Sequence, residues 1–392
     1  MSAPTWIWQR PDWPQLWFDP QAAAPHLAEA YRMHGVIEGK AAAIGLTSTS
    51  EITLEAMAHE VVATAAIEGE RLSMDIVRSS VMRRLGLAAT GPVDRSVDGL
   101  VAVVNDANAA CDQRLSEDRL CRWQSALFPG GTSGIQRIAV GRYRDHEDPM
   151  QIVSGPLGRE VVHYEAPRSA DVPRHMQAFL AWFDATSPAR TAAAPGPAID
   201  GLARAAIAHL WFETIHPFED GNGRVGRAIV EMAVAQHLKP SLRLYSLSRQ
   251  LLASRKDYYD QLNLVQRGTL DATAWVAWFA RQCTAAYEAA DQVMDQALQK
   301  RRFWEAHAST ALNERQRKVL QRLLDDGDSG FSGGLNAEKY IKMTGTSKAT
   351  ATRDLSEMVS NGQLWTAGAG KATRYYINVP GWRHGIESGA RS

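Results

Sequence analysis

The twelve residues from 216 to 227 constrain this chain more than any other segment. They read His-Pro-Phe-Glu-Asp-Gly-Asn-Gly-Arg-Val-Gly-Arg and combine an imidazole, carboxylates, an amide, three glycines and two guanidinium groups. A segment that only fills a hydrophobic core has no use for this combination. The pattern predicts a loop that leads into the N-terminus of a helix, where glycines let an anion approach and free N–H groups attract phosphate oxygens.

Each polar side chain of this segment suits one task at a phosphate site. Arg224 and Arg227 lie three residues apart on the first helical turn and can clamp phosphate. Asp220 offers the hard oxygen ligand that Mg²⁺ prefers. His216 is the natural proton acceptor near neutral pH. The other residues of the predicted phosphate cradle are Gly221, Asn222, whose amide can donate a hydrogen bond, Gly223, Val225 and Gly226.

The three glycines also match the pattern G-x-G-x-x-G of dinucleotide-binding folds. Such a site needs a strand before the pattern and an acidic residue about 20 positions after it. The preceding run, 203–212, has a helical pattern instead, and no acidic residue lies near position 245. A P-loop would require a following Lys-Ser or Lys-Thr, which is absent. A plain helix N-cap would explain one glycine and one aspartate, but not the cluster.

Composition sets broad limits. The 392 residues predict two or three domains, and 43 basic against 43 acidic residues give no support to bulk binding of nucleic acid or membrane surfaces. Cys111, Cys121 and Cys283 lack zinc-ligand spacing and are odd in number, so we expect a reducing cytoplasm. Neither a signal peptide nor an apolar run of about 18 residues is found, so no membrane span is expected.

Hydrophobic periodicity predicts a mainly helical chain with one hairpin. Residues 1–20 read as an extended arm rich in Trp and Pro, and one helix of the region 19–87 ends at Gly69. Two β-prone runs, 151–154 and 160–164, flank a Gly-Pro turn and predict a hairpin. Further helices are predicted at 173–183, 200–209, 226–237, 248–266 and 273–303, the last as a connector.

Residues 311–379 predict a separate unit. Helices at 314–324, 335–343 and 347–361 precede two short β-runs, at 364–365 and 374–377, which is the element order of a winged helix-turn-helix. The predicted recognition helix carries Lys348 and Arg353, while Asp354 and Glu357 dilute its charge. Duplex DNA and a protein partner both remain open for this unit.

The central segment resembles the signature of Fic domains, H-x-F-x-[DE]-G-N-G-R-x-x-R, and fits it at every fixed position. The likeness extends from about residue 100 to 285 and includes Gly-Arg-Tyr-Arg at 141–144, the hairpin, and Lys-Asp-Tyr-Tyr at 256–259. The N-terminal region also looks like the helical extension of many Fic proteins.

The resemblance implies a protein adenylyltransferase, which moves AMP from ATP onto a hydroxyl group of a target protein. His216 would deprotonate the hydroxyl, and Asp220 would hold Mg²⁺. Arg224 would bind the β-phosphate and Arg227 the γ-phosphate, while Asn222 and the glycine amides cradle phosphate oxygens. The chemistry then depends on positioning and charge neutralisation.

The resemblance also assigns the hairpin as a flap that pairs with a strand of the target. Val161, Val162 and His163 of the flap are expected at the nucleotide, together with Tyr259. Gln266 stands where some relatives carry Asn. Gly221 favours nucleotidyl transfer, because a kinase-like subgroup carries Ala there.

A second motif, Thr-Ala-Ala-Ile-Glu-Gly at 64–69, fits the family's inhibitory pattern [ST]-x-x-x-E-[GN]. Thr64 and Glu68 share a helical face, and Glu68 lies in the last turn, where the helix dipole disfavours an anion. A cation should compensate. The resemblance implies that this cation is Arg227 and that Glu68 thereby displaces the γ-phosphate, whereas a solvated surface glutamate is the alternative.

These expectations combine into one architecture: a Fic-type helical core with a β-hairpin flap, an N-terminal helical extension and a C-terminal winged helix. The expected divisions are 1–99, 100–290, a connector at 291–310, and 311–380. Relatives also make removal of AMP an alternative activity, since the inhibitory glutamate can position water, and they make a homodimer possible. A DNA-binding regulator with a nucleotide-sensing Fic region is the second class of function.

Overall fold

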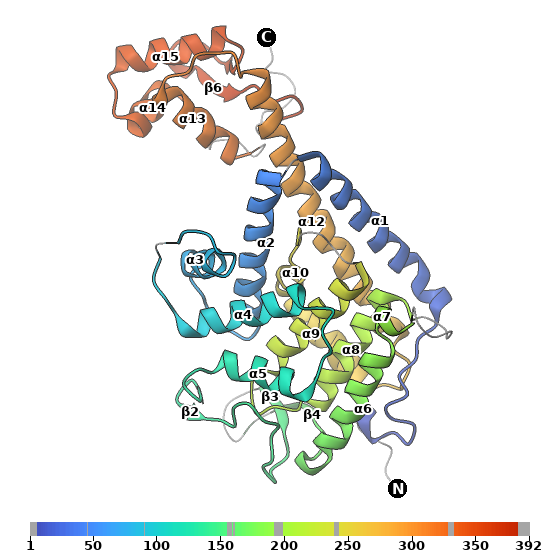
Figure 1. Ribbon diagram of the computed structural model, residues 1–392. Coiled ribbons are helices and arrows are strands. Elements are labelled where there is room, and N and C mark those ends of the chain that lie inside the picture. Colours follow the sequence, from blue (N-terminus) through green and yellow to red (C-terminus); the bar gives the residue numbers. More distant parts are fainter. Residues whose placement is uncertain are drawn as a thin grey trace. The chain divides into compact units, whose positions relative to one another are not determined.

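The protein is described by a computed structural model, which covers residues 6–44, 46–89, 91–154, 159, 161–191, 199–238, 243–327 and 333–382. The chain divides into two compact units, residues 1–291 and 292–392. Helices predominate in both, which confirms the predicted mainly α-helical fold (Figure 1). None of the helices described is long and apolar enough to cross a membrane.

The first unit is built around two neighbouring helices, α8 and α9, which pack closely against each other (Figure 1). Every residue of α8 is buried, which explains why its sequence has no polar face. The helices of this unit are α1 (Pro20–Ile44), α2 (Leu46–Ile67), α3 (Met74–Arg84), α4 (Arg95–Ala109), α5 (Glu117–Leu127), α6 (Val172–Ala185), α7 (Pro188–Thr191), α8 (Gly201–Ile215), α9 (Asn222–Leu238), α10 (Leu247–Ala253) and α11 (Arg255–Gln266), with α12 (Thr273–Ala306) running on into the second unit.

Two predicted helices differ from the observed ones. The helix expected at 226–237 already begins at Asn222, so the second half of the central segment is helical. The helix expected at 248–266 is two helices, α10 and α11, which meet at Ser254. Ser254 is the C-cap of α10 and the N-cap of α11, but its side chain does not cap α11, because the hydroxyl donates back to the Gln250 carbonyl of α10 at 3.0 Å.

Helix α2 ends where the sequence predicts. Gly69 has φ +88°, and its N–H donates to Ala66 while that of Glu70 donates to Ala65. A left-handed residue after the last turn is the common way to satisfy the final carbonyls of a helix. The chain therefore reverses at Gly69, which leaves Glu68 and Glu70 on either side of the turn. Helix α2 packs against α3, α10 and α9.

The predicted hairpin is confirmed as β3 (Gln151–Ser154) paired antiparallel with β4 (Val161–Glu165). Its Gly-Pro turn lies outside the described residues. The N-terminal arm contains a short 3-10 helix, Ile7–Gln9, and supports the hairpin: Trp6 packs edge-on against Tyr164, and the Trp8 indole donates to the Glu165 carbonyl at 2.8 Å. A smaller hairpin, β1 (Thr132–Ser133) and β2 (Gln136–Arg137), and a 3-10 turn at Ser169–Asp171 complete the unit.

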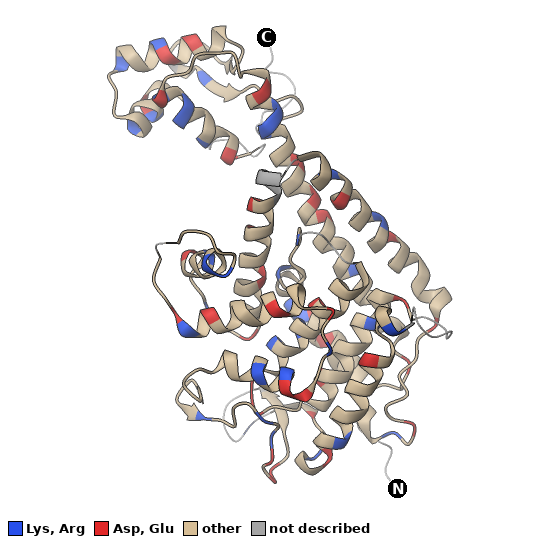
Figure 2. Ribbon diagram, in the orientation of Figure 1, with Lys and Arg blue, Asp and Glu red and all other residues tan. Residues whose placement is uncertain are grey.

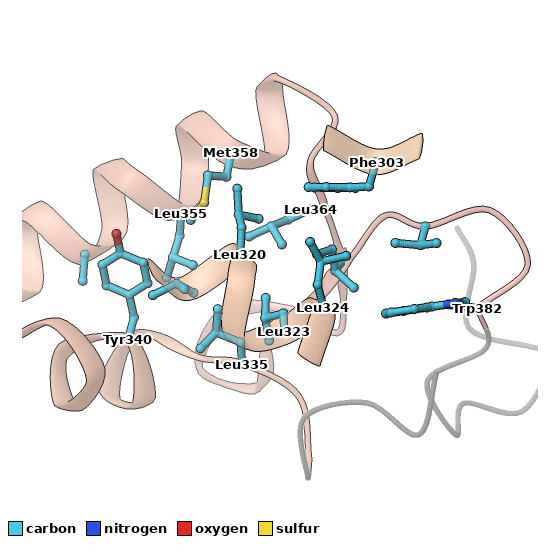
Figure 3. Packing of buried hydrophobic residues seen from close by; sticks show 14 residues of the cluster. Phe303, Leu320, Leu323, Leu324, Leu335, Tyr340, Leu355, Met358, Leu364 and Trp382 are labelled. Atoms are coloured by element: carbon cyan, nitrogen blue, oxygen red, sulfur yellow. The ribbon is translucent and has the colours of Figure 1, made fainter. Parts of the chain in front are cut away.

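The second unit has its own hydrophobic core (Figure 3). Its elements are α13 (Glu314–Asp325), α14 (Ala337–Thr344), α15 (Lys348–Ser360), β5 (Leu364–Ala367) and β6 (Arg374–Ile377), with a 3-10 turn at Gly370–Ala372. A bridge from Leu335 to Tyr375 adds a third short partner to the β5–β6 hairpin. The order of these elements is the one expected for a winged helix. Figure 2 shows basic and acidic residues mixed along the helices of each unit.

Candidate active site

His216 ends α8 in an unusual backbone conformation. Its φ of 50° and ψ of 60° are left-handed, and no other non-glycine residue of the described chain has a positive φ. Such a conformation is costly for a residue with a Cβ and persists only where its surroundings enforce it. Here buried Arg144 does so: its Nε donates to the His216 carbonyl at 2.8 Å, and its own N–H donates to Pro217.

The loop between α8 and α9 is closed by Asn222. The Asn222 amide accepts from the Phe218 N–H at 2.9 Å and donates to the Phe218 carbonyl at 2.8 Å. Because the amide oxygen and one amide N–H are used inside the loop, the side chain of Asn222 shapes the loop. We had expected it to cradle a phosphate instead. Phe218 is fully buried and anchors the loop.

Glycine is required at position 221 for two reasons. Its φ is +88°, and a Cβ there would lie 2.9 Å from the Phe128 ring and 3.2 Å from Leu127. The Val225 N–H already donates to the Gly221 carbonyl at 3.0 Å, so the N–H groups of residues 222–224 are those that precede the first helical bond. The helix N-terminus that the sequence predicted is therefore present, and its free N–H groups are those of residues 222–224.

The structure assigns Val225 and Gly226 to packing. Val225 is completely buried. A Cβ on Gly226 would lie 2.3 Å from the Glu213 carboxyl and 3.2 Å from the His209 ring. The bare helix surface at 226 therefore makes room for two polar side chains of α8. Neither Val225 nor Gly226 lines the cavity that His216, Gly223 and Arg227 border.

Glu68 and Arg227 form an ion pair, with Arg227 Nη2 2.7 Å from Glu68 Oε1. Thr64 completes the contact, since its hydroxyl and its carbonyl accept from Arg227 at 2.7 and 2.9 Å. The Glu68 carboxylate lies against Gly223, where a Cβ would come within 2.1 Å of Oε1. Burial alone would lower the pKa of Arg227, but Glu68 raises it above its ordinary value, so the guanidinium stays charged.

Sequence reasoning missed a second contact of the motif, made by the segment that follows α2. Arg224 Nη1 donates to Glu70 Oε1 at 2.9 Å, and the guanidinium also lies over the Phe128 ring. Arg224 is buried whereas Glu70 is about half exposed. The sequence did offer a signal, because Glu70 directly follows the inhibitory pattern. The pattern itself specifies only one glutamate, Glu68, so Glu70 was not considered.

Asp220 is partly exposed and points toward the β1–β2 hairpin, where Ser133 donates to its carboxylate. Its other oxygen accepts from the Gly221 N–H. Within the described residues no cluster of three or more His, Cys, Asp or Glu could hold a metal by itself. A single carboxylate fits Mg²⁺ only when a substrate supplies further ligands, which is how Mg²⁺ commonly binds with phosphates.

A cavity of about 770 Å³ lies beside His216, Gly223 and Arg227 of the motif, whereas Asp220, Asn222 and Arg224 do not line it. Its lining includes His216, Glu68, Arg227, Gly223 and the aromatic ring of Tyr259, and α11 supplies Arg255, Asn263 and Gln266. The Arg255 Nε donates to the Ile67 carbonyl at 2.7 Å, so this wall of the cavity also holds the end of α2.

The flap residues divide in their placement. His163 and Ile152 line the cavity. Val162 instead packs with the small cluster around Trp6 and Tyr164, and Val161 is exposed. The side chains of Val161 and Val162 therefore do not line this cavity, and their contact with a nucleotide stays a prediction.

Charge in the cavity favours a neutral imidazole. Burial lowers the pKa of His216 to about 4, and the nearby Arg144 guanidinium acts in the same direction. Burial raises the pKa of Glu213, which also lines the cavity, to about 8. At neutral pH His216 is therefore uncharged, the state in which it can accept a proton.

The site lies in a segment of the chain that matches a known family model. The Fic/DOC family matches residues 114–234, and a domain of unknown function, DUF4172, matches residues 6–87. The curated protein adenylyltransferase Fic of Nematostella vectensis is 22% identical over 234 residues, which are 59% of this chain and 47% of that protein. The chain thus spans about half the length of this relative.

Two crystal structures share the fold. A Fic family protein from Desulfovibrio desulfuricans matches with a TM-score of 0.52 at 19% identity, over 92% of this chain and 97% of its own. A Fic domain containing signaling protein from Bacteroides thetaiotaomicron matches with a TM-score of 0.50 at 13% identity, over 69% of this chain and 97% of its own. At these identities the likeness concerns the fold.

Proposed function

We propose that this chain, which belongs to the Fic/DOC family, is a protein adenylyltransferase that its own helix α2 holds inhibited. One observation carries the proposal: His216 and Arg227 line the same cavity, and the Glu68 carboxylate forms an ion pair with the Arg227 guanidinium there. A group that can accept a proton and a group that can bind an anion thus line the same cavity.

The reaction assigned to the site is the transfer of AMP from ATP. The neutral His216 ring takes the proton of a target hydroxyl, whose oxygen bonds to the α-phosphorus while the bond to pyrophosphate breaks. The N-terminus of α9 and the guanidiniums of Arg224 and Arg227 stabilise the phosphate charge. Asp220 would hold Mg²⁺, which neutralises phosphate charge further when bound.

Inhibition follows from competition for the same guanidinium. In the described state Arg227 is 3% exposed and donates to Glu68 and Thr64. A phosphate group that pairs with Arg227 Nη2 would have to displace the Glu68 carboxylate. ATP would then bind weakly or with its phosphates misplaced until α2 shifts.

The position of a radioactive label tests the proposal. Purified wild-type protein and the Glu68→Gly variant are incubated with Mg²⁺ and ATP labelled at either the α- or the γ-phosphate. We expect the variant to gain label from α-labelled ATP alone, and mass spectrometry to find AMP on a hydroxyl side chain. Label from γ-labelled ATP would indicate a kinase, and loss of AMP from a previously modified protein would indicate removal.

A second candidate function concerns the second unit. Lys348, Thr352 and Arg353 are exposed on α15, whereas Asp354 is buried and bonded to Arg315. The exposed Glu357 dilutes the charge of this surface, as expected, whereas Asp354, contrary to our expectation, does not. This favours contact of α15 with the phosphates of duplex DNA.

Fluorescence anisotropy with a labelled duplex tests DNA binding. We expect the affinity to fall steeply with salt and the double variant Lys348→Ala and Arg353→Ala to lower the salt slope by about two. An affinity that is unchanged in the double variant, or no binding at low salt, would leave protein contact as the function of this unit.

A further inference from the structure

Glu213 is a carboxyl group inside the cavity that the proposed chemistry does not use. It lies on α8, one turn before His216, and only 5% of it is exposed. Its Oε2 is 3.8 Å from His216 Nδ1. Its Oε1 makes no hydrogen bond in the part of the chain that is described, and neither does His216 Nδ1.

The surroundings of Glu213 keep its carboxyl group unpaired. Within the described residues no lysine or arginine lies within ion-pair distance of it, although Arg227 acts on it from α9. The other titratable groups that face it are Glu68 just after α2, His209 of α8, His216 at the end of α8, Tyr258 and Tyr259 of α11, and Tyr164 of β4. A buried carboxyl without a cation is held in its neutral form.

The other carboxylates near His216 are already engaged. Glu68 pairs with Arg227, Asp220 accepts from Ser133 and Gly221, and Glu219 accepts from the Ala139 N–H at 2.9 Å. Glu68 and Asp220 still act on the His216 ring through their charge, as does the Glu213 backbone, but Glu213 is the carboxyl group beside the ring whose Oε1 the described contacts leave unused. Its distance from Nδ1 has to shorten by about 1 Å to reach hydrogen-bond length.

We propose that Glu213 is the positioning residue of His216. A Glu213 carboxyl oxygen accepts the Nδ1–H of the imidazole, which leaves Nε2 without a proton and turned toward the cavity. The two ring nitrogens are distinct, and the partner of one decides what the other can do. Catalytic contacts are often long without substrate and shorten in the reacting complex.

In the proposed transfer this arrangement has a defined consequence, and this part rests on the proposed function. When the target O–H bond breaks and the Nε2–H bond forms, positive charge appears on the ring. Glu213 faces that charge from the Nδ1 side, while Arg144 opposes it. The reaction then depends on Glu213 as an acceptor and not on its negative charge.

Two substitutions separate positioning from bulk, both made in the Glu68→Gly background. Glu213→Ala should lower kcat for transfer about 100-fold, the contribution typical of proton transfer, while the Kd of ATP changes less than about threefold. Glu213→Gln keeps a carbonyl acceptor and should recover kcat to within about tenfold of the parent. The matched control is Glu231→Gln. Glu231 is also a buried carboxyl, but it lies on α9 and pairs with Arg243, so this substitution should leave kcat unchanged.

Nitrogen-15 spectra of histidine rings test the same contact without any transfer. We expect His216, assigned by loss of its signal in His216→Ala, to hold its proton on Nδ1 in the parent and in Glu213→Gln, and to mix both tautomers in Glu213→Ala. A tautomer that is identical in all three proteins would overturn the proposal, even if no nucleotide were ever transferred. Equal loss of kcat and of ATP affinity in both Glu213 variants would show a structural role and would also overturn it.

Discussion

Each unit contains a buried carboxylate–guanidinium pair, and the two pairs differ in how completely they are satisfied. In the second unit Asp354 accepts from Arg315 at 3.0 Å, from the Tyr340 hydroxyl at 2.9 Å and from Asn313 at 3.4 Å. In the first unit Arg227 pairs with Glu68 at 2.7 Å. Its Nη1 has no partner in the described chain although the residue is 3% exposed.

This difference indicates that the Asp354–Arg315 pair stabilises the fold, whereas the Glu68–Arg227 pair keeps a donor available for a ligand. Buried polar groups are nearly always satisfied, so an exception calls for a reason. Asp354 ties α15 to α13 and α14 and borders a packed core. Arg227 instead borders a cavity that His216 also lines, so an anionic ligand could accept a hydrogen bond from the unpaired Nη1.

His216→Ala is expected to produce the largest effect, because it removes the only side chain assigned to accept the proton. In the Glu68→Gly background, self-modification should fall by a factor of about 1,000, while the affinity for ATP, measured by calorimetry, stays within about threefold. If the variant still transferred AMP at a tenth of the parent rate, the cavity would do its chemistry with another group.

Glu68→Gly tests the pair that we regard as a brake. Freed from its partner, Arg227 should bind ATP more tightly, and self-modification should rise by about 10- to 100-fold, since one charge-assisted contact corresponds to about 1.5–3 kcal/mol. Calorimetry and labelled ATP measure the two effects. The matched control is Glu55→Gly, which removes an exposed pair of α2 with Arg78 and should change neither.

Asp354→Ala tests the satisfied pair. We expect a loss of about 2 kcal/mol in the unfolding free energy of the second unit, because several donors lose their acceptor. Burial opposes it, but hydrogen bonds from Arg315 and Tyr340 hold the pKa of Asp354 below its ordinary value.

The direction of that shift fixes the pH dependence. A carboxyl with a lowered folded-state pKa adds stability above the unfolded pKa of about 3.9 and loses it as the pH falls through the folded value. Denaturant unfolding at pH 7 and pH 3 should therefore show a smaller difference between wild type and Asp354→Ala at pH 3. Self-modification in the Glu68→Gly background should be unaffected, and a parallel loss of transfer would remove the contrast between the two pairs.

The sequence predicted the elements better than the direction of their side chains. Periodicity placed the helices and the hairpin, and the left-handed turn at Gly69 followed from the residue type. It could not show that Asn222 closes its own loop or that Gly226 makes room for Glu213, because both depend on packing between α8 and α9. Asp354 was misjudged for the same reason: a charged residue on a helix reads as exposed until its neighbours are known.

Glu70→Ala should have the smallest effect. Glu70 pairs with Arg224 at 2.9 Å, but it is 47% exposed, and exposed pairs stabilise by well under about 1 kcal/mol. We therefore expect self-modification to rise two- to fivefold in the Glu70→Ala variant, and to rise by a similar factor when the substitution is added to Glu68→Gly. Labelled ATP measures the rates, and 0.5 M salt should reduce the difference between Glu70→Ala and wild type, because salt screens an exposed pair. A rise as large as that of Glu68→Gly would mean that Glu70 holds the end of α2 against the motif as firmly as Glu68 does. The greater exposure of the Glu70–Arg224 pair would then not make it the weaker contact.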